Sequence, residues 1–85
     1  MDYVIIVFRS RTHTVGFSNA LSKTGIANQI ISTPKELGVG CGLSVKIRKE
    51  HTARIKRLLA GNIPNTFVGI FSVKHVAGSK YIRSI

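Results

Sequence analysis

The chain has 85 residues, 44% of them hydrophobic and 19% charged, which predicts one folded domain over residues 1–85 and argues against a disordered tail or a deep catalytic cavity. Thirteen Lys and Arg against three Asp and Glu give a formal charge of +10. So large an excess favours anionic partners such as nucleic acid, phosphate or an acidic protein.

The first part of the chain predicts a strand, a helix and a second strand. Residues 3–8 are a continuous run of β-branched and aromatic side chains, typical of a central strand and too short to span a membrane. Ser10 or Thr12 can cap the following helix, which ends at a glycine. Residues 26–32 then predict a strand near a sheet edge, because Pro34 cannot donate to a ladder.

Residues 43–48 are the clearest strand in the sequence. Apolar and polar side chains alternate there with a period of two, which is typical of a strand with one buried face. We expect the other face to present Ser44, Lys46 and Arg48.

The remaining segments complete an α+β pattern. Residues 50–60 predict a second helix with Leu58 on its apolar side, residues 67–76 a fourth strand, and residues 77–85 a short edge strand or a frayed end. The order β-α-β-β-α-β predicts a ferredoxin-like fold, with two helices on one face of a four-stranded antiparallel sheet.

The only cysteine lies in a glycine-rich loop, within the sequence GVGCG of residues 38–42. Gly38, Gly40 and Gly42 permit positive φ angles, so backbone N–H groups can turn toward one point. Such a loop can expose Cys41 and offer hydrogen-bond donors to its thiolate. The loop does not open a helix and is therefore not a dinucleotide-binding fingerprint.

Two interpretations of Cys41 remain open on this reasoning. Lys35 and Lys46, with Arg48 as a further candidate, could lower the pKa of the thiol and favour the reactive thiolate. Alternatively, Cys41 is a small buried hydrophobic side chain and the glycines serve only the turn. A single cysteine forms no internal disulfide, which suits a reducing cytoplasm.

Several short pieces of the sequence occur at a characteristic spacing: Phe8-Arg9-Ser10, Ala20-Leu21, Gly25-Ile26, Pro34-Lys35 and Cys41-Gly42-Leu43. Together they resemble the family of selenium- or sulfur-carrier-like proteins. The resemblance implies that Cys41 holds sulfur or selenium as a persulfide or selenosulfide, exchanged with donor and acceptor proteins, and that the chain is not an enzyme. Lys35 replaces the usual arginine, which keeps the charge but loses the bidentate fork. Thr14 and Ser18 replace an alanine and a glutamate.

A nucleic-acid-binding module is the alternative of a different class. Its candidate residues are Arg48, Lys49, Arg54, Lys56 and Arg57. A ferredoxin-like sheet is the scaffold of RNA-recognition modules. However, residues 43–48 contain no aromatic ring on which a base could stack, so a solvated basic surface is the simpler interpretation.

The three histidines give no reason to expect a metal or another cofactor. His13, His51 and His75 fall on separate predicted elements, without the spacing of metal ligands. Nothing in the sequence brings one of them to Cys41.

Overall fold

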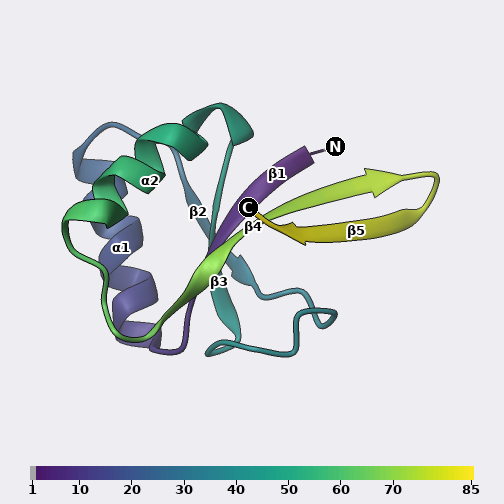
Figure 1. Ribbon diagram of the computed structural model, residues 1–85, viewed down its shortest axis with the longest axis horizontal. Coiled ribbons are helices and arrows are strands. Elements are labelled where there is room, and N and C mark those ends of the chain that lie inside the picture. The colour runs from purple at the N-terminus through teal and green to yellow at the C-terminus, as the bar shows by residue number, and fades with distance from the viewer. Residues whose placement is uncertain (1) are drawn as a thin grey trace.

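A computed structural model describes residues 2–85 and shows an α+β fold with two α-helices and one five-stranded antiparallel sheet (Figure 1). The elements are β1 (Asp2–Phe8), α1 (Arg11–Lys23), β2 (Gln29–Ser32), β3 (Leu43–Ile47), the 3-10 turn η1 (Lys49–His51), α2 (Thr52–Gly61), β4 (Phe67–Val76) and β5 (Ser79–Ser84). The strand order is β2-β3-β1-β4-β5, and all neighbours are antiparallel. In the described residues, no helix is long and apolar enough to cross a membrane.

The sheet has five strands rather than the predicted four, because residues 79–84 form the edge strand β5, one of the two alternatives predicted for the end of the chain. β5 pairs with β4 from Phe71↔Ser84 to Val76↔Ser79, and the two form a long hairpin that projects from the domain (Figure 1). Its turn places both Ala77 (φ 50°) and Gly78 (φ 79°) in the left-handed region. Glycine adopts that conformation readily but alanine rarely does, so only one of the two turn residues is typical of a hairpin and the turn is hard to recognise from the sequence.

β2 is shorter than predicted, although its position at a sheet edge is confirmed. It begins at Gln29 rather than at residue 26. Ile26 is buried in the core instead, and its N–H donates to the Leu21 carbonyl at 3.0 Å as the chain leaves α1. The apolar character of Ile26 therefore reflects packing under the helix, not strand pairing.

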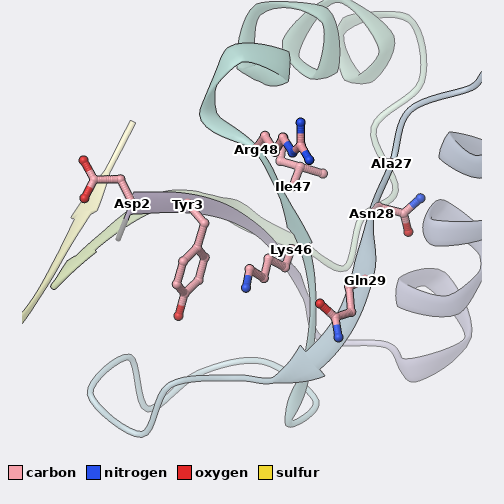
Figure 2. Close-up of a pocket in the computed structure, with 8 residues that line it drawn as sticks. All are labelled: Asp2, Tyr3, Ala27, Asn28, Gln29, Lys46, Ile47 and Arg48. Atoms are coloured by element: carbon pink, nitrogen blue, oxygen red, sulfur yellow. The ribbon is translucent and has the colours of Figure 1, made fainter.

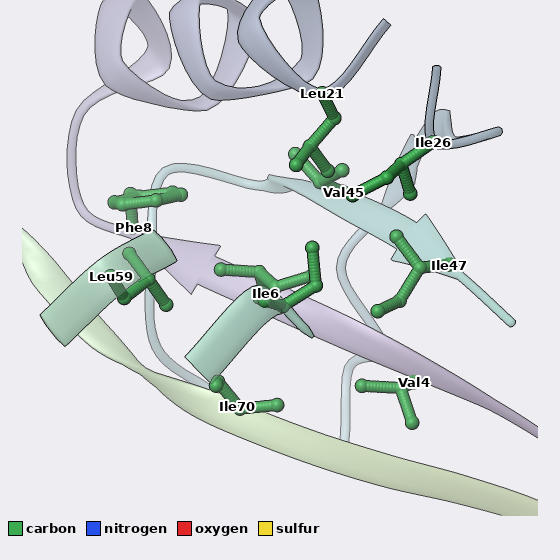
Figure 3. Close-up of a cluster of buried hydrophobic side chains, with 10 residues drawn as sticks. Val4, Ile6, Phe8, Leu21, Ile26, Val45, Ile47, Leu59 and Ile70 are labelled. Carbon is green, nitrogen blue, oxygen red and sulfur yellow. The ribbon is translucent and has the colours of Figure 1, made fainter. Parts of the chain in front are cut away.

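Both helices pack on one face of the sheet. Val4, Ile6 and Phe8 of β1 point toward them and meet Leu21 of α1 and Leu59 of α2 in a continuous buried cluster (Figure 3). Contrary to the prediction, Leu58 does not join this cluster and is 43% exposed. The buried side of α2 is therefore narrower than the apolar side predicted from the sequence.

The opposite face, called the helix-free face below, carries the alternate β1 side chains Tyr3, Ile5 and Val7. Leu37, from the loop between β2 and β3, packs against its cluster. Ser44, which we expected to be exposed, is fully buried on β3, with its Oγ 2.7 Å from Thr33 Oγ1. The loop thus covers the part of this face next to the end of β1.

Candidate functional site

The candidate site begins where β1 ends and α1 starts. Ser10 caps the helix, and its Oγ accepts from the His13 N–H at 3.2 Å. One turn into the helix, Thr14 is fully buried, and its Oγ1 donates to the Ser10 carbonyl at 2.9 Å. The N-terminus of α1 and the buried Thr14 hydroxyl therefore lie beside the end of β1.

The glycine-rich loop is fastened to the end of β1. The Cys41 N–H donates to the Phe8 carbonyl at 3.1 Å. Gly40 has φ +94°, and a Cβ built there would lie 2.8 Å from Val7 Cγ1 and 3.2 Å from the Phe8 carbonyl oxygen. Only glycine allows this close approach with this backbone conformation. The loop sequence therefore determines where Cys41 lies.

The Cys41 thiol is half-buried and contacts α1 directly. Its Sγ lies 3.5 Å from Thr14 Oγ1 and 3.6 Å from the Leu43 carbonyl oxygen. As a thiol, Cys41 can donate to either oxygen. As a thiolate it needs donors, and Thr14 can turn its single hydroxyl proton from Ser10 to the sulfur. The Ser10 carbonyl remains satisfied, because it also accepts from the Thr14 N–H at 3.0 Å.

The surroundings of Cys41 favour its anionic form. Burial raises the pKa of the thiol, but the Thr14 hydroxyl, the backbone of Leu43 and of Cys41 itself, and the Arg11 guanidinium together outweigh burial, so the pKa lies below the ordinary cysteine value. A site beside a helix N-terminus and a cation is where cysteine thiolates are stabilised in proteins. Cys41 therefore has the environment of a nucleophile.

Sequence reasoning missed Arg11 and gave Thr14 no role at the thiol. The signals were present, since Ser10 marks the helix start and puts Arg11 in its first turn and Thr14 one turn on. What the sequence does not show is that the loop, 27 positions away, meets that turn.

The structure separates the two lysines proposed to support the thiolate. Lys35 and the three loop glycines line a shallow depression of about 180 Å³ on the loop. Gly38, Gly40 and Gly42 all have positive φ. Lys46 instead lies with its Nζ 4.5 Å from the centroid of the Tyr3 ring. The cation that lowers the pKa of Cys41 is Arg11.

The basic residues of the nucleic-acid alternative do not all present free side chains. Arg54 donates to the Thr24 carbonyl at 3.2 Å, and Lys56 to the Ile85 carbonyl at 2.8 Å. Arg48 lines a cavity beside Tyr3, whereas Lys49 and Arg57 are exposed on η1 and α2. Two of the five cations therefore brace α2 against other segments.

The histidines lie apart from one another. His13 Nδ1 is 2.5 Å from Thr66 Oγ1, His51 belongs to η1, and the His75 ring lies 6.1 Å from the Tyr3 ring. Among residues 2–85, no three His, Cys, Asp or Glu side chains are grouped as a metal site requires.

Comparison with known proteins gives one match. Residues 3–67 match the family described as "Putative Se/S carrier protein-like". The match runs from β1 to the beginning of β4 and includes Arg11, Thr14 and Cys41. No curated protein and no solved structure matches the chain.

Proposed function

Because the chain belongs to the Se/S carrier-like family, we propose that it carries one sulfur or selenium atom on Cys41 Sγ, as a persulfide or selenosulfide, and passes it to a partner protein. The observation that supports this proposal best is the contact of Cys41 Sγ with Thr14 Oγ1 at the start of α1. There the thiolate finds a donor and the charge of Arg11, and the thiolate is the attacking form in sulfur exchange.

Loading needs no oxidant. The Cys41 thiolate attacks the terminal sulfur of a donor persulfide, R–S–SH. The new bond joins Cys41 Sγ to that sulfur, the S–S bond of the donor breaks, and its electron pair leaves with the donor as R–S⁻. The product is Cys41–S–SH, and the corresponding step with a terminal selenium gives the selenosulfide.

Delivery uses the same chemistry in reverse. The thiolate of an acceptor protein attacks the outer sulfur, and Cys41 leaves as a thiolate. A leaving thiol of low pKa departs faster, so the features that stabilise the Cys41 anion assist unloading as well as loading. The chain has one cysteine, so both the donor and the acceptor thiol come from other proteins. In this proposal the chain is a stoichiometric carrier rather than an enzyme.

The test is intact-mass measurement after incubation with cysteine persulfide, and in parallel with glutathione selenopersulfide. We expect a mass gain of one chalcogen atom, removed by dithiothreitol and absent in Cys41→Ser. The Cys41→Ser variant should unfold close to the wild-type denaturant midpoint, because the thiol is only half-buried. A thiol that reacts only after denaturation in urea would make Cys41 structural and refute the proposal.

A further inference from the structure

The helix-free face has an open end as well as the end covered by the loop. The strand registers place Lys46 of β3 beside Ile5 of β1, and Gln29 of β2 beside Lys46. On the other side of β1, Tyr3 pairs with Val73 of β4, and the Tyr3 ring lies 6.1 Å from the ring of His75. Aromatic, amide and cationic side chains from four strands therefore meet around Tyr3.

A cavity of about 370 Å³ lies at this open end (Figure 2). Tyr3, Gln29, Lys46 and Arg48 are among the residues that line it. The volume falls within the range of small-ligand sites, about 300–1,000 Å³, so one nucleotide is of a suitable size. Asp2 also lines the cavity, and its carboxylate can accept a hydrogen bond from a base N–H group such as N3–H of uracil.

Tyr3 and Lys46 form a pair suited to a nucleotide. The Lys46 ammonium lies 4.5 Å from the centroid of the half-buried Tyr3 ring. Figure 2 shows both side chains pointing to the same side of the sheet. A base that stacks on Tyr3 would displace the ammonium, which can then pair with the phosphate of the same nucleotide. Arg48, exposed at the rim, offers a second cation for the neighbouring phosphate.

We infer that the helix-free face of the sheet binds single-stranded RNA, with a base against Tyr3 and phosphates on Lys46 and Arg48. An antiparallel sheet with aromatic rings on its open face is how RNA-recognition modules hold unpaired bases. The net charge of +10 favours association with a polyanion, and Lys46 and Arg48 supply cations at the cavity. The sequence-based alternative was weakened because residues 43–48 contain no aromatic ring, and here Tyr3 of β1 and His75 of β4 provide the rings. Of the basic residues considered for that alternative, only Arg48 belongs to this site.

The test is fluorescence anisotropy with a labelled oligouridylate of about twelve nucleotides, a length within known single-strand site sizes. We expect Tyr3→Leu to weaken binding at least about fivefold through lost stacking, with an unchanged salt dependence. Arg48→Gln should weaken binding and reduce the slope of log K against log salt by about 0.7, the contribution of one phosphate contact. Thermal unfolding of each variant checks that it is folded.

Arg57→Gln is the matched control, because it removes the same charge from an exposed position on α2, outside the cavity. It should leave affinity within about twofold, since one distant charge contributes little at physiological salt. Cys41→Ser should also bind normally, which separates this site from the carrier function. Equal losses in Arg57→Gln and Arg48→Gln, or displacement of the RNA by polyglutamate as efficiently as by unlabelled RNA, would overturn the inference.

Discussion

At Cys41, the Thr14 hydroxyl proton is one of the groups that set the balance between thiol and thiolate. Thr14 Oγ1 lies 2.9 Å from the Ser10 carbonyl oxygen and 3.5 Å from Cys41 Sγ, and its single proton serves only one of them at a time. Arg11 adds a charge that favours the sulfur anion. Burial of Thr14 shields this exchange from water, which makes the hydrogen bond to the anion more valuable than it would be at the surface.

Thr14→Val tests this role, because valine has nearly the same shape but no hydroxyl. We expect the midpoint of the iodoacetamide alkylation rate against pH to rise, since the thiolate loses its donor. Thr14→Ser keeps the hydroxyl and should stay near the wild-type midpoint. Identical midpoints for the valine and wild-type proteins would show that Thr14 does not stabilise the thiolate.

The lowered pKa of Cys41 also makes the free energy of unfolding depend on pH. The Cys41 pKa is lower in the folded chain than in the unfolded chain, so between the two values the unfolded state binds more protons. Stability therefore rises with pH across that interval, and this contribution disappears as pH falls through the folded pKa. Urea midpoints measured against pH should show the rise in wild type and a smaller one in Thr14→Val.

At the scale of the elements, the loop is built around one close contact. Gly40→Ala would put a Cβ 2.8 Å from Val7 Cγ1, at φ +94°. We expect a loss of about 2–5 kcal/mol in the free energy of unfolding, because backbone strain of about 1–2 kcal/mol adds to overpacking of about 1–3 kcal/mol. Because Gly40 precedes Cys41, the alkylation rate of the thiol should change as well. Urea titration measures the free energy of unfolding, and iodoacetamide kinetics measure the alkylation rate.

Two other glycines are the controls. A Cβ at Gly42 would meet nothing within 4 Å, although φ is +93°, so Gly42→Ala should cost only the strain, about 1–2 kcal/mol. Gly16 lies inside α1 with free space and no positive φ, and Gly16→Ala should stabilise the helix by about 0.5–1 kcal/mol. A loss at Gly42 as large as that at Gly40 would contradict the contact with Val7.

Local patterns predicted most elements, and tertiary contacts account for the errors. The whole of β4 followed from its apolar run, and Ser10, which caps α1, was one of the two caps that the sequence offered. Ser44 was assigned to a solvent-exposed face because its strand alternates, but a loop covers that face. Arg11 was overlooked for a related reason, since its partner Cys41 comes from a distant loop. Periodicity describes one element at a time and does not show what covers it.

At the scale of the whole molecule, the charge is poorly compensated. The chain carries +10, and within residues 2–85 one salt bridge is found, between Lys80 and Glu36 at 3.8 Å. Both side chains are partly exposed, and such pairs contribute about 0–1 kcal/mol. Repulsion among cations is therefore the larger electrostatic effect on folding, and it opposes the compact state.

Salt should consequently stabilise the protein. Raising sodium chloride screens the repulsion, and a gain of about 1 kcal/mol raises the Tm of a domain of this size by about 4–8 °C. Chloride is preferable to sulfate, which strengthens apolar burial by itself. The double variant Lys49→Glu with Arg57→Glu lowers the net charge at two exposed positions, so its Tm should respond less to salt. A wild-type Tm that falls as salt is added would mean that attractive pairs, rather than the excess of cations, dominate the electrostatics of the fold.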